Sequence, residues 1–173
     1  NDRVVKYDKN FNVLNRWGTS GNGRGQFSKP TGIAVDLDGA VYVADSGNCR
    51  VQRFDRDGVF TGQWGIRGSG HGEFSSSIQG LAVGPDGFIY VIDTGNSRIQ
   101  KFGSDGTYVT HWGSYGSDNG QFRTPVGISI ASDGSIYVLD EYNKNIQKFN
   151  GEGSFMLSWG NAGSGNEQLN YPQ

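Results

Sequence analysis

Few residues in this chain are suited to metal or acid–base chemistry. The sequence contains two histidines, His71 and His111, and one cysteine, Cys49. A catalytic zinc site takes three protein ligands, and an intrachain disulfide takes two cysteines. His71 lies in a glycine-rich segment and His111 directly precedes Trp112, so we expect no metal set within this chain. We predict no catalytic residue, no metal site and no cofactor, and we expect Cys49 to fill space.

Two acidic segments resemble the start of a calcium-binding loop. They are Asp36-Leu-Asp-Gly39 and Asp55-Arg-Asp-Gly58. Neither is followed by the spaced oxygen ligands and the bidentate Glu that complete such a loop. Asp-Gly between apolar runs is a strong turn signal. We therefore interpret both segments as turns.

Two further catalytic motifs are absent from the sequence. The sequence has no Gly-x-Ser-x-Gly elbow of a serine hydrolase. The glycine-rich run from Gly21 to Gly25 follows a predicted strand but opens no helix, so we expect no phosphate cradle. What remains is a set of charged and aromatic residues that could bind a partner: Arg24, Arg67, His71, Tyr115, Glu141, Tyr142 and Lys144.

A repeat in the sequence indicates which elements position these residues. Trp-Gly pairs begin at Trp17, Trp64, Trp112 and Trp159, with separations of 47, 48 and 47 residues. A fixed period of this length is typical of a repeat architecture. Three other residue types keep the same step, which chance would not produce. These series are Phe27, Phe74 and Phe122; Gly32, Gly80 and Gly127; and Asp45, Asp93 and Asp140.

Each repeat contains four strand-length apolar segments separated by turn signals. In the first full repeat they are Gly32–Asp36, Val41–Asp45, Arg50–Phe54 and Val59–Trp64. Helical spacing does not persist over any full window. Four antiparallel strands per repeat are typical of a propeller blade, which buries its faces against neighbouring blades. The predicted fold class is all-β, a β-propeller arc of four-stranded antiparallel blades.

The repeat resembles the NHL repeat. The resemblance rests on Pro30–Asp36, Val41–Asn48, Arg50–Phe54 and the pair Trp64-Gly65, which recur in the next two repeats. The third repeat departs from the pattern, because Asn145 stands where the first two have arginine. NHL-like propellers close with about six blades, so the resemblance implies a ring of roughly 280 residues.

In this register the whole chain, residues 1–173, is one repeat region of about three and a half blades. Residues 1–17 form a half blade, and residues 30–64, 78–112 and 125–159 form full blades. An open arc exposes an apolar blade face at each end, and such faces aggregate or find partners. We expect the chain to be a fragment of a longer propeller. Self-association of several chains into a ring is the alternative.

Strand alternation predicts two faces. The long loops between blades and the turns between second and third strands lie on one face, and the Asp-Gly turns lie on the other. The binding candidates fall on the first face, where loops on a rigid scaffold carry binding residues. Residues that recur in every blade are expected to serve the blade, with Asp45 bonded to Arg50 and Asp93 to Arg98. The recurring residues are Asp45, Asn48, Arg50, Asp93, Asn96, Arg98, Asp140 and Asn143, with Trp17, Trp64, Trp112 and Trp159.

We predict a binding or interaction module that presents this loop face to a protein, a glycan or another ligand. One alternative is part of a metal-dependent lyase or hydrolase whose active-site residues lie in further blades. The other is an RNA-binding NHL domain, which the net charge of −2 and the scattered Lys and Arg residues disfavour. No stretch is apolar over the length of a membrane span. We favour an extracellular or cell-surface location over a cytoplasmic one.

Overall fold

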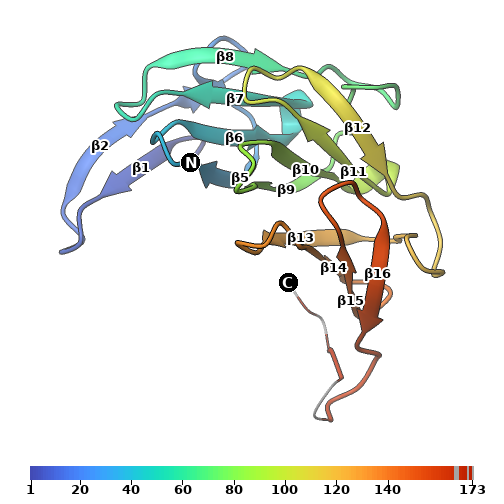
Figure 1. The fold of residues 1–173 in the computed structure, drawn as a ribbon. Helices are drawn as coiled ribbons and strands as arrows, with labels where there is room; N and C mark the ends of the chain where they lie inside the picture. The colour runs from blue at the N-terminus through green and yellow to red at the C-terminus, as the bar shows by residue number, and fades with distance from the viewer. Residues whose placement is uncertain (166–167, 171, 173) are drawn as a thin grey trace.

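The computed structural model describes residues 1–165, 168–170 and 172. Three four-stranded antiparallel sheets follow one another along the chain, each with its strands in sequence order. They fan out around a common centre, which is the arrangement of blades in a β-propeller (Figure 1). The strands are β5 (Pro30–Val35), β6 (Val41–Asp45), β7 (Arg50–Phe54) and β8 (Phe60–Trp64); β9 (Ile78–Val83), β10 (Ile89–Asp93), β11 (Arg98–Phe102) and β12 (Tyr108–Trp112); and β13 (Pro125–Ile130), β14 (Ile136–Asp140), β15 (Asn145–Phe149) and β16 (Phe155–Trp159).

A two-stranded antiparallel sheet precedes the first blade. It pairs β1 (Val4–Tyr7) with β2 (Val13–Trp17). Two very short strands, β3 (Thr19–Ser20) and β4 (Gln26–Phe27), pair in parallel inside the loop that follows. The repeat pattern does not predict this second pair, because two residues are too few to show alternation.

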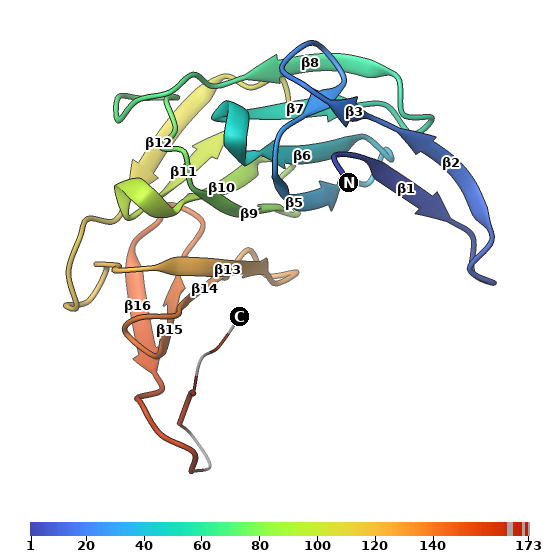
Figure 2. The same cartoon turned by 180° about the vertical axis from the view of Figure 1, so that it is seen from behind.

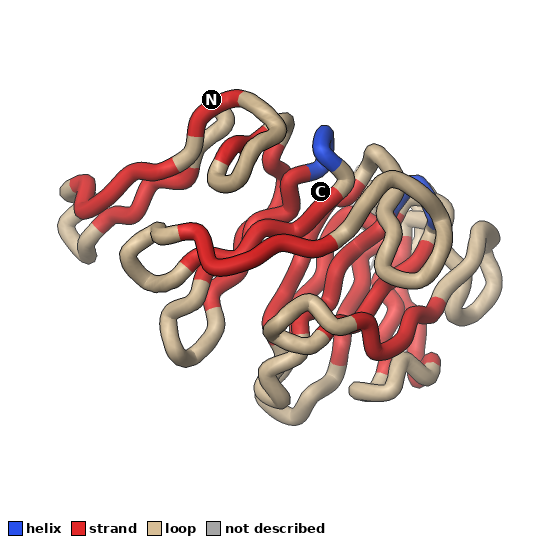
Figure 3. The backbone as a smooth tube through the Cα atoms, turned by 90° about the horizontal axis from the view of Figure 1, so that it is seen from above, coloured by secondary structure: helices blue, strands red, loops and turns tan. Residues whose placement is uncertain are grey.

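The turns between second and third strands lie on the same face as the long loops, as predicted. In the first two blades each turn contains one turn of 3-10 helix, η1 (Ser46–Asn48) and η2 (Thr94–Asn96), and Figure 3 shows both on one side of the strands. The Nδ2 atom of Asn48 donates a hydrogen bond of 2.9 Å to the carbonyl of Gly21, which joins the turn to the loop. The described part of the chain holds no helix with the length and apolarity needed to cross a membrane.

The innermost strands of the blades, β5, β9 and β13, lie side by side at the centre (Figure 2). Gly32 in β5 faces Gly80 in β9. A Cβ atom added to Gly32 would lie 2.9 Å from the Cα atom of Gly80, which is closer than any side chain tolerates. Glycine at this position therefore permits the close approach of the first two blades.

The hydrophobic core lies between the blades. Phe102 of the second blade is fully buried, and its ring centre is 5.8 Å from that of Trp64 in the first blade. Phe149 and Trp112 repeat this contact between the third and second blades at 5.9 Å. Cys49 is buried as a free thiol in the core between the first two blades, where it fills space. Each core is complete only when two blades stack.

Three tryptophans also lie against the turn between the third and fourth strands of the following blade. A side chain added to the turn glycine would meet the indole ring at 2.5–2.7 Å in all three cases. The pairs are Trp17 with Gly58, Trp64 with Gly106, and Trp112 with Gly153. Trp159, the fourth of the series, is 40% exposed. It borders a cavity of about 850 Å³ together with Gly160, Asn161 and Gln168.

Gly106→Ala is expected to destabilise the protein more than Gly87→Ala. Both glycines have positive φ, +89° and +79°, where an alanine is strained by about 1–2 kcal/mol. Only at Gly106 would the new methyl group collide with the Trp64 ring, and such overpacking adds about 1–3 kcal/mol. No atom lies within 4 Å of a Cβ at Gly87. Urea denaturation of both variants measures the difference, and equal losses would contradict a packing role for the Trp–Gly contact.

The acidic segments form turns. Oδ1 of Asp55 accepts hydrogen bonds of 2.9 Å from the backbone N–H groups of Asp57 and Val59. Asp36 makes the same pair of bonds in the preceding turn, at 3.0 and 2.8 Å. One oxygen of each carboxylate is thus used to close its own turn, which confirms the interpretation as turn residues.

Candidate binding site

A buried aspartate holds the loop face of the first blade together. Asp45 is fully buried, and its Oδ2 accepts a hydrogen bond of 2.7 Å from Nε of Arg50. The same oxygen accepts a bond of 2.9 Å from Nδ2 of Asn48. Arg50 also donates bonds of 2.8 Å to the backbone carbonyls of Asn22 and Gly23. The arginine therefore clamps the long loop onto the hairpin.

The second blade repeats this clamp. Arg98 pairs with Asp93 at 2.9 Å, and Asn96 donates to the same carboxylate oxygen at 2.8 Å. Arg98 also donates to the carbonyls of Ser69 and Gly70, both at 2.8 Å. Both ion pairs are the hairpin contacts expected from the sequence, so these recurring residues stabilise the blade.

The third blade keeps the aspartate but has no arginine clamp. Asp140 accepts hydrogen bonds from the backbone N–H groups of Arg123 and Thr124, at 2.7 and 3.1 Å, and from Nδ2 of Asn143 at 3.0 Å. Asn145 replaces the arginine, and its buried Oδ1 has no hydrogen-bond partner among the described residues. The loop face of this blade therefore differs from the repeat.

Arg123 stands where the first two blades have Ser28 and Ser75, and its guanidinium lies beside two tyrosine rings. Its Cζ atom is 5.1 Å from the ring centre of Tyr142 and 6.0 Å from that of Tyr115, within the range of cation–π attraction. The tyrosines are 63% and 73% exposed, respectively. Within the described residues, Nε of Arg123 is buried without a partner and the side chain forms no ion pair. We call Tyr115, Arg123 and Tyr142 the tyrosine–arginine cluster.

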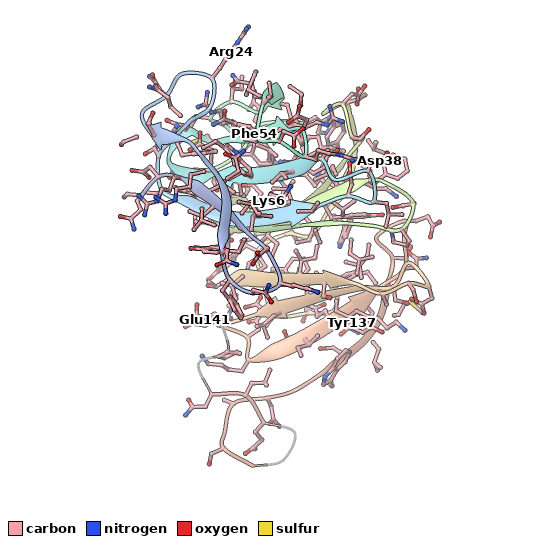
Figure 4. All side chains as sticks on the ribbon, turned by 90° about the vertical axis from the view of Figure 1, so that its left-hand side faces the viewer. Lys6, Arg24, Asp38, Phe54, Tyr137 and Glu141 are labelled. Atoms are coloured by element: carbon pink, nitrogen blue, oxygen red, sulfur yellow. The ribbon has the colours of Figure 1, made fainter. Side chains whose placement is uncertain are left out.

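A cavity of about 350 Å³ adjoins this cluster. It is lined by Thr124, Glu141, Tyr142 and Lys144. The backbone N–H of Glu141 donates a bond of 2.9 Å to the carbonyl of Thr124, which fixes the rim. Figure 4 shows Glu141 and Asp38 near opposite edges of the molecule, with Asp38 on an Asp-Gly turn.

Four of the residues predicted from the sequence thus lie on the third blade: Tyr115, Glu141, Tyr142 and Lys144. Arg123, at the centre of the cluster, was not among the predicted residues. The signal that could have identified it is a break in the repeat, namely an arginine where both other blades have serine.

Arg24 and His71 occupy equivalent positions in the long loops of the first two blades, and each covers an aromatic ring of the outer strand. Cζ of Arg24 lies 5.8 Å from the ring centre of Phe60. His71 stacks on Tyr108 with ring centres 4.8 Å apart and an interplanar angle of 6°. In Figure 4 the end of the Arg24 side chain extends outward from the ribbon. Both residues are exposed, and their role in binding stays a prediction.

Arg67 is exposed on the loop of the second blade. It forms a parallel bridge to Phe74, just as Tyr115 forms one to Phe122 on the third blade. The predicted residues Arg24, Arg67 and His71 therefore lie on the loops of other blades than the tyrosine–arginine cluster.

The two histidines lie close together, which their separation in the sequence did not indicate. The ring centres of His71 and His111 are 5.3 Å apart, and Nδ1 of His111 is 2.7 Å from the hydroxyl of Tyr108. The long loop precedes its blade in the sequence but folds back over the outer strand. Among the described residues, no group of three or more His, Cys, Asp or Glu side chains is placed to hold a metal ion.

We expect acidification to destabilise the fold through His111. Burial lowers the pKa of His111 below its usual value of 6.5, and the charges of Arg98 and His71 lower this pKa further. Because the unfolded state then binds the proton more tightly, the stability contribution is complete above pH ~6.5 and is lost as the pH falls toward the pKa in the folded state. Denaturation midpoints at about pH 7.5 and about pH 5.5 should differ more for the wild type than for His111→Gln. An NMR titration midpoint of His111 above 6.5 would contradict this expectation.

A family model described as NHL repeat matches the chain three times, at residues 27–54, 76–102 and 122–149. The chain belongs to the NHL-repeat family. Each match runs from the end of a long loop, or from just beyond it, to the third strand of a blade. It therefore includes both the clamp aspartate and the position of the clamp arginine in each NHL repeat. A search of curated proteins finds no match to this chain.

Solved structures similar to this NHL-repeat chain include a streptogramin B lyase, with a TM-score of 0.68 and 16% identity, covering 91% of this chain and 47% of that one. A catalytically inactive virginiamycin B lyase from Staphylococcus aureus with Quinupristin has a TM-score of 0.67 and 15% identity, at 91% and 48% coverage. A chain of a nidogen/laminin complex has a TM-score of 0.64 and 20% identity, at 90% and 57% coverage. These likenesses show the propeller fold. The chain spans about half the length of the structures it matches.

Proposed function

We propose that this chain is a binding module that docks a protein partner on its loop face, at the tyrosine–arginine cluster of the third blade. One observation carries the proposal. At the positions of Arg123 and Tyr142 the first two blades have serine and glycine, whereas the third blade presents a guanidinium within cation–π distance of an exposed aromatic ring. Tyr and Arg are the residue types that dominate the binding energy of protein interfaces.

The scaffold supports this assignment. The cluster is carried by a loop and a turn at the end of a four-stranded sheet, and loops on rigid scaffolds are where binding residues concentrate. The cavity beside Tyr142 can receive a side chain of a partner. One of the similar structures is a nidogen/laminin complex, so a chain with this fold occurs in a protein complex.

The enzyme alternative stays a prediction about blades beyond this chain. The lyases among the similar structures share the fold at 16% and 15% identity. Both histidines of this chain are engaged with Tyr108, one by stacking and one by a hydrogen bond. The binding proposal therefore has the more specific support.

The test compares the two faces of the arc. A partner is isolated by affinity purification with the wild-type chain and identified, and its affinity is then measured by biolayer interferometry. Tyr142→Ala and Tyr115→Ala are each expected to weaken binding at least about tenfold. An exposed aromatic side chain that becomes buried against a partner contributes on the order of 2 kcal/mol to binding. Asp38→Ala, on the opposite face, should bind as the wild type does. Unchanged binding by both tyrosine variants would contradict the proposal.

A further inference from the structure

We infer that the tyrosine–arginine cluster receives a carboxylate from an acidic segment of the partner, with Arg123 as its anchor. This inference rests on the proposed function and names the chemistry that the partner must present. It starts from the fact that the backbone, rather than the side chain, of Arg123 does the structural work of its position. The N–H of Arg123 donates to Asp140 at 2.7 Å, as the N–H of Ser28 donates to Asp45 at 2.7 Å in the first blade.

The guanidinium of Arg123 has no acidic partner of its own. Arg50 and Arg98 each form a buried ion pair, whereas none is found for Arg123 in the described residues. Among the nitrogen atoms of the guanidinium only Nε is fully buried without a hydrogen-bond partner, and neither Nη atom donates a hydrogen bond within the described residues. Their parallel N–H groups match the two oxygens of a carboxylate.

The two tyrosines prepare this guanidinium for binding. Contact with the Tyr142 and Tyr115 rings holds the planar group in one orientation and removes part of its hydration. A group that is already ordered loses less entropy when a ligand binds. The exposed tyrosine faces also offer apolar contact to the residues on either side of the bound carboxylate.

The charges around the cluster favour a single carboxylate over a polyanion. Glu141 and Lys144 both line the adjoining cavity, so this cavity offers a chain of phosphates no excess of positive charge beside Arg123. The net charge of the whole chain, −2, also opposes a polyanion. An acidic peptide can place one carboxylate on Arg123 and a neighbouring neutral side chain in the cavity of about 350 Å³.

The buried Nε atom provides a direct measurement. Because this N–H is shielded from water, its NMR signal is expected to be visible at neutral pH, and Arg123→Lys identifies it by its loss. The probe is the peptide acetyl-Gly-Glu-Gly-Glu-Gly-amide, compared with the same peptide carrying Gln in place of Glu and with inorganic phosphate. We expect the Nε–H signal to shift in a saturable way with the Glu peptide only.

Matched variants separate a specific site from general attraction. Arg123→Gln should weaken binding of the Glu peptide at least about tenfold, and Arg16→Gln, the same charge change on an exposed arginine of β2, should leave it unchanged. Thermal unfolding of both variants confirms that they fold. The inference is overturned if the Nε–H signal does not move, if phosphate or the Gln peptide moves it equally, or if Arg16→Gln weakens binding as much as Arg123→Gln does.

The inference and the proposed function fail in different ways. If the tyrosine variants abolish binding of the isolated partner while Arg123→Gln does not, the carboxylate inference is wrong and the proposed function stands. If neither kind of variant affects the partner, the proposed function is wrong.

Discussion

Asp93→Ala is expected to lower the free energy of unfolding by about 3–5 kcal/mol. The substitution leaves Arg98, which is 6% exposed, without its counter-ion. It also removes the acceptor for the backbone N–H of Ser75 at 2.9 Å and for Asn96 at 2.8 Å. Removing one partner of a buried ion pair leaves the other charge buried without compensation. The free-energy cost of that buried charge exceeds the net contribution of the pair to stability. For a chain of this size the loss corresponds to a fall in Tm of roughly 6–20 °C.

Calorimetry or urea denaturation of Asp93→Ala measures this effect against Asp38→Ala, an exposed turn carboxylate expected to change stability by less than about 0.5 kcal/mol. Arg98→Asn is a second comparison, because the third blade naturally has Asn145 at this position and keeps Asp140 satisfied by backbone N–H groups. We expect Arg98→Asn to be the milder change. A larger loss for Arg98→Asn than for Asp93→Ala would show that the arginine, rather than the aspartate, organises the turn.

Phe102→Ala is expected to destabilise the protein by about 3–5 kcal/mol. The ring is fully buried between the first two blades, with ring centres at 5.8 Å from Trp64, 5.6 Å from Phe74 and 6.1 Å from Tyr108. Residues on a β-sheet move little to fill a void, so the lost contacts are only partly recovered.

The control for Phe102→Ala is Phe11→Ala, because Phe11 is 85% exposed and its truncation should change stability by less than about 0.5 kcal/mol. Phe102→Leu keeps most of the volume and should lose less than Phe102→Ala, so a measurable midpoint remains even if the alanine variant does not fold. Equal midpoints for Phe102→Ala and Phe11→Ala would contradict a core located between the blades.

Most of the fold could be predicted because each blade pairs strands that are neighbours in the sequence. Apolar alternation and Asp-Gly turns are local signals, and together they determine strand register in a hairpin. The Asp45–Arg50 pair was predictable for the same reason, since the two residues face each other across one hairpin. The repeat then extends each local conclusion to the other blades.

The binding cluster was only partly predictable, because it joins segments that the repeat separates. Tyr115 lies in the loop before the third blade and Tyr142 in a turn within it, and their shared contact with Arg123 depends on how the loop folds back. The same folding back brings His71 to His111. Arg123 itself was missed because it directly follows Phe122, which recurs before each blade, and its difference from Ser28 and Ser75 shows only when the three repeats are compared position by position.

The exposed Trp159 has a practical consequence for solution studies. Trp17, Trp64 and Trp112 are only partly exposed and lie against glycine turns, whereas Trp159 is 40% exposed beside a large cavity. A water-soluble quencher such as acrylamide should therefore extinguish mainly the emission of Trp159. Any molecule that covers this edge of the third blade should protect that emission and shift it to shorter wavelength. The chain thus carries an intrinsic optical reporter for the one edge where its tryptophan series is not capped by a glycine turn.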